Sequence, residues 1–366
     1  MTTEHEVSPQ QSFVPSILPW FVAAGALAIY LVTLNRWVSL SSLEQVATAA
    51  GWNWRPEVYG PLYWLVTYPF RWLPPRMIPL ALNSFAAVCA ALSLALLARS
   101  VALLPHDRTH GQRQQETSQN GFLSIPTAWL PPVLAALVCG LQLTFWEHAT
   151  AVSSQSPPWG SGCEMLDLLL FAYVIRCLLE FRVVERESWL LRAALAYGAA
   201  MTNNWAMIGF LPAFLLAVVW IRGLDFFNLR FLGRMSFCGL LGLLLYLLLP
   251  VVLSAGDASS AGFWPALKAN LGAQRSILMA LYKYGRHEVA LLALTSLLPV
   301  FIFGIRWASY FGDTSQLGIR LATFMFHIVH ALFLLACIWV ALDPPFSPRT
   351  RGFGSPFLTF YYLGAL

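Results

Sequence analysis

Residues 77–104 read MIPLALNSFAAVCAALSLALLARSVALL, an apolar run that carries a single charged side chain, Arg99. About 20 apolar residues suffice for a helix to cross the hydrocarbon core of a bilayer, and this run is longer than that. A helix also satisfies all of its own backbone polar groups, as lipid requires. The run therefore predicts a membrane-spanning helix.

Similar apolar runs follow one another along the chain. Of its 366 residues, 58% are hydrophobic and 11% are charged, and the mean hydropathy is +0.63. This composition excludes a water-soluble domain, so we predict an all-α, polytopic integral membrane protein with about ten transmembrane helices. The other predicted spans are residues 13–34, 126–146, 163–181, 188–221 as a broken pair, 235–254, 288–306, 319–342 and a last run at 357–366.

The connections between the runs predict an orientation. Short loops rich in arginine stay on the cytoplasmic side, and two such loops carry Arg182, Arg186, Arg192, Arg222, Arg230 and Arg234. The longer connections at 35–76, 147–162, 255–287 and 343–356 then face outward. We expect a plasma-membrane protein, the inner membrane in a bacterium, with these large loops in the periplasm or exterior. The tryptophans of 35–76 suit headgroup depth.

Residues 188–221 are too long for one ordinary span and too short for two. Thr202, Asn203 and Asn204 interrupt the run, so we predict two short helices that meet at this polar break. Backbone groups freed by such a break must face protein or water and not lipid.

The ends of the chain complete the organisation. We expect residues 1–12 to be a disordered tail and 13–366 to be one polytopic domain, which stops inside an apolar run as a truncated chain would. The formal charge is +5, but its arginines flank apolar runs, where they anchor helices or contact lipid. We therefore expect membrane lipid as a partner and no nucleic acid. The six cysteines lack zinc spacing and are read as small core residues.

Candidate functional groups gather in the predicted outer connections. Carboxylates there could serve as a base or a metal ligand, and lysine or arginine could hold a phosphate. This layout favours an enzyme that uses a lipid-borne substrate at the outer leaflet. The candidates are Glu44, Glu57, Glu164, Asp167, Asn203, Asn204, Lys268 and Arg275.

The order of several short motifs resembles a family. Glu44 ends a Ser-Ser-Leu-Glu stretch where the family typically has Asp-Ser-Gly-Glu, and residues 56–62 match the spacing of its next motif without the histidine. Phe145–Trp146, Asn203–Asn204 and Leu249–Pro250 match three further motifs. The chain thus resembles the membrane domain of unknown function related to protein O-mannosyltransferases, within the GT-C glycosyltransferases.

The resemblance implies a GT-C-like fold and transfer of a sugar from a polyprenyl-phosphate carrier to a protein or glycan acceptor. Glu44 would be the catalytic base, in place of an aspartate that this sequence lacks. Glu57, Glu164, Asp167, Asn203, Asn204, Lys268 and Arg275 would contact substrate. No cofactor is certain, and a divalent metal is left open.

Each candidate also has a structural interpretation. Glu44 can be a solvated charge, and Glu164 with Asp167 can stabilise a helix N-terminus. Lys268 and Arg275 can extend along apolar surface toward water. The rival functions are a catalytically degenerate carrier-binding or scaffold protein and a transporter of lipid-linked glycans. A transporter predicts a polar path across the spans, of which the sequence gives little sign.

Overall fold

The computed structural model describes residues 13–39, 42–52, 60–103, 129–152, 163–222, 226, 228–255 and 262–284. Every regular element within these ranges is a helix. The expected tail at 1–12, Glu57, the expected spans after residue 287 and the end of the chain lie outside the described residues.

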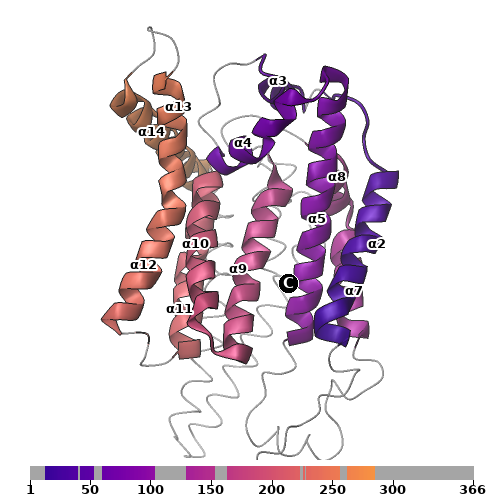
Figure 1. The fold of residues 1–366 in the computed structure, drawn as a ribbon, viewed down its shortest axis with the longest axis vertical. Helices are drawn as coiled ribbons and strands as arrows, with labels where there is room; N and C mark the ends of the chain where they lie inside the picture. The colour runs from indigo at the N-terminus through magenta and orange to yellow at the C-terminus, as the bar shows by residue number, and fades with distance from the viewer. Residues whose placement is uncertain are drawn as a thin grey trace, which may run out of the picture.

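Five long helices form the body of the molecule and run side by side along its long axis (Figure 1). Each packs against the next, in the order α2, α5, α9, α10 and α12. The apolar runs of the sequence form these helices as predicted, within a few residues at each end except for α12, which begins earlier than expected. Their bounds are Leu18–Val32, Ile78–Leu103, Glu164–Val184, Glu187–Asn203 and Leu229–Leu243.

Glycines set the distance between α10 and α12. A Cβ atom on Gly198 would lie 2.2 Å from the backbone oxygen of Gly239. A Cβ atom on Gly242 would lie 2.5 Å from the backbone oxygen of Leu195. Small residues let membrane helices approach closely and gain packing contacts, so these positions hold the two backbones together.

The predicted span at 126–146 is bent in the structure, by 73° between α7 (Leu130–Gly140) and α8 (Leu143–Thr150). Gln142 adopts an extended backbone at the start of α8. The Tyr30 hydroxyl donates a hydrogen bond of 2.8 Å to the carbonyl of Gly140, at the end of α7. The bend is thus stabilised by a side chain that satisfies a carbonyl at the break.

Short helices cover one end of the bundle. They are α3 (Leu43–Ala49), α4 (Pro61–Thr67) and the 3₁₀ turns η2 (Tyr68–Trp72) and η3 (Pro75–Met77). They lie near the top of Figure 1, across the ends of the long helices. Trp52 is 73% exposed, and Trp37 and Trp72 are exposed as well. The prediction of an ordered aromatic connection is confirmed for the described part of 35–76.

The region 255–287 contains more helix than predicted. After η7 (Leu244–Leu247) and α13 (Leu248–Ala255), α14 spans Phe263–Tyr284. Reading this stretch as a loop was wrong because its charged and amide residues lower its hydropathy, whereas Ala266 and Asn270, one turn apart, form a buried stripe. Pro265 sits in the first turn, where a missing N–H costs nothing.

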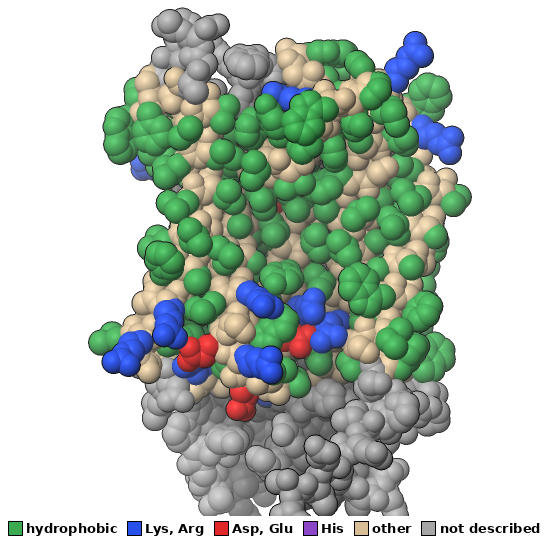
Figure 2. All heavy atoms as spheres, viewed as in Figure 1, with side chains coloured by type: hydrophobic (Ala, Val, Ile, Leu, Met, Phe, Trp, Pro, Cys, Tyr) green, Lys and Arg blue, Asp and Glu red, His purple; other side chains and the backbone are tan. Residues whose placement is uncertain are grey.

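The opposite end of the bundle is basic. The Glu187 carboxylate forms ion pairs with Arg222 and, at 3.7 Å, with Arg234. The two arginine-rich connections therefore lie together, at the end remote from α3 and α4. Figure 2 shows these charges below a broad apolar belt. Which end faces the exterior remains a prediction.

Within the described residues, three helices are long and apolar enough to cross a membrane, or four if the bent pair counts as one span. They are Phe13–Val32, Pro75–Leu103 and Leu229–Val252. At 1.5 Å per residue, α9 is also about 30 Å long, but it carries charges near both ends. The expected ten spans are not confirmed.

Candidate functional site

The predicted break near Thr202–Asn204 is confirmed. Helix α10 ends at Asn203, Asn204 has extended dihedrals of −144° and 113°, and the 3₁₀ helix η5 (Trp205–Phe210) leads into α11 (Leu211–Arg222). Two phenols bond carbonyls on either side of the break. Tyr197 donates to the carbonyl of Met207, and Tyr246 donates to that of Met201 at 2.9 Å.

Asp167 accepts hydrogen bonds from both asparagines of this break. Its Oδ1 accepts from Asn203 Nδ2, and its Oδ2 accepts from Asn204 Nδ2 at 3.1 Å. The Oδ1 of Asn203 accepts in turn from the backbone N–H of Tyr63 at 3.1 Å. We call Asp167, Asn203 and Asn204, with the backbone of Tyr63, the Asp167 cluster. It joins α9, α10 and α4 at the end of the bundle covered by the short helices.

The cluster is largely buried, and Asn204 is its partly exposed member. Asp167 is 1% exposed, and Asn203 is also buried. Burial of a carboxylate is favourable only where it is paired or hydrogen-bonded, and the two amides supply that compensation. Asp167 also lies in the first turn of α9, where negative charge interacts favourably with the helix dipole. In this structure the side chain is therefore positioned to hold elements together.

A second buried pair lies one turn away on α9. Glu164 Oε2 is 3.3 Å from His148 Nδ1 of α8, and both side chains are buried. The pair carries a full ionic attraction only when the imidazole is protonated.

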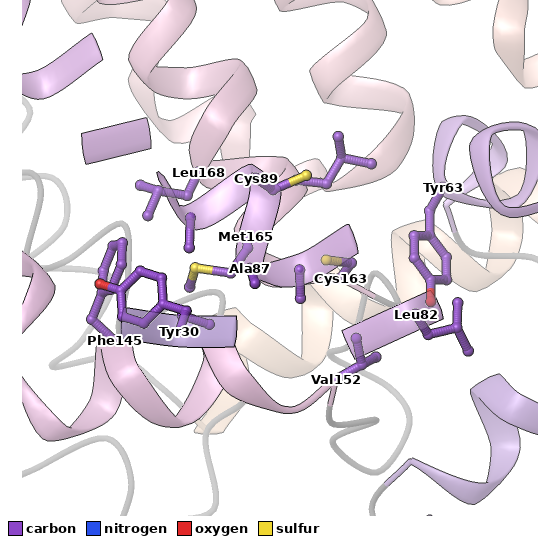
Figure 3. Packing of buried hydrophobic residues seen from close by; sticks show 14 of the residues in the cluster. Tyr30, Tyr63, Leu82, Ala87, Cys89, Phe145, Val152, Cys163, Met165 and Leu168 are labelled. Atoms are coloured by element: carbon purple, nitrogen blue, oxygen red, sulfur yellow. The ribbon is translucent and has the colours of Figure 1, made fainter. Parts of the chain in front are cut away.

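Tyr63 is a buried phenol beside this region. Its hydroxyl has no hydrogen-bond partner among the described residues. Burial raises the pKa of the phenol well above its ordinary value, and the thiols of Cys163 and Cys89 add to the shift. Tyr63 is therefore neutral at physiological pH. Figure 3 shows it in the core cluster that also contains Cys89, Cys163 and Met165.

The structure does not bring all the predicted site residues into this cluster. Glu44 is half-buried in the first turn of α3, which packs mainly on α5 and η2. Lys268 and Arg275 are exposed on α14. The hydrogen bonds described for the Asp167 cluster involve none of these three residues.

Asn83 is a structural residue that the sequence interpretation missed. Its Nδ2 donates to the carbonyl of Asn35 at 2.7 Å, and its Oδ1 accepts from the N–H of Val152 at 2.9 Å. The sequence signal for it was a lone amide inside an apolar run, since a polar side chain within a membrane helix usually indicates a structural or functional role. Asn83 fixes the start of the first large connection to α5 and to the end of α8.

A metal site is not apparent in the part of the chain that the structure describes. It holds no group of three or more histidine, cysteine, aspartate or glutamate side chains arranged to bind an ion.

These features define a helical membrane protein with a hydrogen-bonded cluster of buried polar groups at one end of its bundle. The family model described as the protein O-mannosyl-transferase TMEM260 N-terminal domain matches residues 58–224. Over these residues the chain is similar to this protein O-mannosyltransferase family. No curated protein and no solved structure matches it at a significant level.

Proposed function

We propose that this protein is a GT-C-type glycosyltransferase that moves a sugar, mannose in the first instance, from a polyprenyl-phosphate carrier to a protein or glycan acceptor. The observation that carries the proposal is the match to the O-mannosyltransferase family over residues 58–224. That range includes every member of the Asp167 cluster and the His148–Glu164 pair. The proposal places the reaction at the outer membrane face, on the side of α3 and α4.

The reaction would be a single displacement with inversion at the sugar. The acceptor hydroxyl oxygen forms a bond to the anomeric carbon while the bond from that carbon to the phosphate oxygen breaks. The hydroxyl proton passes to a carboxylate, and polyprenyl phosphate leaves with the bonding electron pair. Basic side chains stabilise the charge on the departing phosphate.

Exposure decides which carboxylate suits the role of base. A general base must come within hydrogen-bond reach of the proton it removes. Asp167 presents almost no surface, whereas Glu44 is partly accessible at the start of α3. We therefore assign the base to Glu44 and a positioning role to Asp167, Asn203 and Asn204.

The remaining candidates are assigned to the substrate. Lys268 and Arg275 lie on an exposed face of α14 and would hold the carrier phosphate, because ammonium and guanidinium groups bind phosphate oxygens. Glu164, held by His148, and Glu57 would contact the sugar or acceptor.

The test uses the full-length protein in lipid nanodiscs. It follows transfer of labelled mannose from polyprenyl-phosphate mannose to a peptide with serine and threonine hydroxyls, with binding of the carrier measured separately. Transfer by the wild type supports the proposal. Glu44→Gln should reduce turnover by about 10²-fold or more, the scale of a lost general base, with carrier binding unchanged. Wild-type turnover in Glu44→Gln excludes this role for Glu44.

A catalytically degenerate carrier-binding protein is the second candidate. It is favoured by the burial of Asp167, whose carboxylate accepts hydrogen bonds from two amides. This candidate predicts saturable binding of polyprenyl-phosphate mannose without transfer to any peptide. Binding without transfer in the wild type would therefore decide for it and against the enzyme.

A further inference from the structure

A second hollow lies at the basic end of the bundle, remote from the Asp167 cluster. It has a volume of about 220 Å³ and lies between the start of α2, the last turns of α5 and the middle of α9. Three leucines and Ala95 form much of its wall, and its polar lining comes from Ser16, Arg99, Tyr173 and Arg176. We call it the Arg99–Arg176 groove.

The charges at this groove do not cancel. Arg99 and Arg176 both bind Oε1 of one carboxylate, that of the buried Glu180, with Arg176 Nε at 3.4 Å. Two guanidinium groups against one carboxylate leave a net charge of +1. The two arginine side chains remain 23% and 27% exposed, so their excess positive charge is accessible from the groove.

Both arginines are held in place before any ligand arrives. Arg99 donates from Nη1 to the carbonyl of Pro15, and Arg176 stacks on the ring of Trp189 at 5.7 Å. These contacts and the shared Glu180 use only part of the five N–H donors that each guanidinium carries. Binding of a ligand here therefore costs little conformational entropy, because the two side chains are already ordered, and this favours affinity.

We propose that the Arg99–Arg176 groove binds the phosphate headgroup of an anionic phospholipid. Guanidinium forks match phosphate oxygens in geometry and charge, and basic pockets between membrane helices suit lipid headgroups. Trp20, 67% exposed at the edge of the groove, has the amphipathic ring typical of headgroup depth. The apolar wall continues onto the lipid-facing surface of α2, where acyl chains would lie.

The size of the groove fits a headgroup and not a larger ligand. Its volume falls below the roughly 300–1,000 Å³ of pockets that enclose drug-sized molecules. A phosphate with its glycerol fits, and the acyl chains remain outside in the bilayer. The site is separate from the sugar chemistry proposed above, since its two arginines pair with Glu180 in the last turns of α9, whereas Glu164 and Asp167 lie in the first turn.

The experiment measures lipid binding to the full-length protein by native mass spectrometry from detergent. Phosphatidylglycerol and phosphatidylcholine, matched in their acyl chains, are titrated separately. Phosphatidylglycerol should bind at one saturable site and more tightly than phosphatidylcholine. Arg176→Gln should weaken phosphatidylglycerol binding by about fivefold or more, as expected for one lost basic contact. Arg234→Gln is the matched control, because Arg234 is exposed at the same end but outside the groove.

Three results would overturn the proposal: equal binding of the two lipids, equal effects of the two substitutions, or displacement of the lipid by millimolar inorganic phosphate. The last result would assign the site to free phosphate. Folding is checked by thermal unfolding in the same detergent. If Arg176→Gln does not fold, Arg176→Lys serves for the same comparison. The lysine keeps a positive charge beside Glu180 but lacks the forked guanidinium group, so it should also weaken lipid binding.

Discussion

Asp167 illustrates what a single side chain does in this fold. It presents two acceptor oxygens to two asparagine amides. The orientation of the Asn203 amide is fixed by a further hydrogen bond to the backbone of Tyr63. Asn203 must keep its oxygen toward the N–H of Tyr63, so its Nδ2 always points at Asp167. The carboxylate is therefore the only side-chain type of its size that accepts from both partners at once.

Asp167→Asn should lower the free energy of unfolding by about 2 kcal/mol, the scale of a lost buried hydrogen bond to a charged group. The new amide has one acceptor oxygen, so one of its two partners meets an N–H₂ group. Thermal or denaturant unfolding in detergent measures the effect. Glu44→Gln, a similar change outside the cluster, is the control and should leave stability within about 0.5 kcal/mol. Equal stabilities for the two variants would contradict the proposed role of the cluster.

Two tyrosines offer a matched comparison of buried phenols. The Tyr30 hydroxyl bonds the carbonyl of Gly140, whereas the Tyr63 hydroxyl is buried without a partner in the described residues. Tyr30→Phe should destabilise by about 1 kcal/mol, and Tyr63→Phe should be neutral or stabilising, because removing an unsatisfied polar group relieves its desolvation penalty. Unfolding measurements on both variants test this. A clear loss of stability in Tyr63→Phe would mean that its hydroxyl is satisfied in solution.

At the scale of elements, the contact between α10 and α12 depends on the absence of a side chain. Gly198 faces the backbone of Gly239 and Gly242 at distances that no Cβ atom tolerates. The helices must therefore separate if any side chain is introduced there. Membrane helices associate largely through packing contacts, because lipid provides no hydrophobic driving force between them, so the lost contacts are not compensated.

Gly198→Ala should lower the free energy of unfolding by about 2 kcal/mol, within the range for overpacked interiors. Gly233→Ala on α12 is the matched control, since a Cβ atom there meets nothing within 4 Å and alanine has the higher helix propensity. The control should be neutral or slightly stabilising. Parallel unfolding curves in detergent make the comparison. The close contact is refuted if both substitutions behave alike.

The elements differ in how far the sequence predicts them. The break at Asn203–Asn204 is predictable because two amides inside an apolar run cannot be left in lipid. The bend between α7 and α8 is not, because it depends on Tyr30, more than a hundred residues away in the chain. The helix α14 is missed because hydropathy measures apolar content, whereas a partly exposed helix needs only one buried stripe.

The sequence indicated the polar residues of the candidate site but not the long-range contacts between them. Asp167, Asn203 and Asn204 stood out as polar groups at the edges of apolar runs, and the structure joins them by direct hydrogen bonds. Their link to Tyr63 crosses 140 positions of sequence, and no local pattern encodes it. The catalytic assignment of Glu44 stays a prediction, as do the substrate contacts.

At the scale of the whole molecule, the two ends of the bundle differ in chemistry. One end holds the exposed Trp37, Trp52 and Trp72 together with the Asp167 cluster, and the other holds the arginine-rich connections with their ion pairs. Such a difference favours one orientation in the membrane, and the positive-inside rule predicts that the arginine end faces the cytoplasm.

Labelling from outside the cell tests this orientation. Cysteine at position 52, exposed beside α3, should react with a membrane-impermeant maleimide in intact cells, whereas Ser188→Cys, exposed at the arginine end, should react only after the membrane is opened. Both substitutions are made in a chain in which Cys238 and Cys337 are replaced by alanine. Labelling of both positions from the same side would refute the predicted topology.

The bonds made by Asn83 bear on how the protein assembles as it is synthesised. One amide group joins Asn35 behind it in the chain to Val152 ahead of it. The helices α2 and α5 can enter the membrane before α8 exists, yet Asn83 has only one of these two partners until residue 152 has left the ribosome. The first large connection is tied down later still, when Asn203 emerges and meets Tyr63. The early helices therefore insert first, and the hydrogen bonds that fix the end of the bundle near α3 and α4 form later.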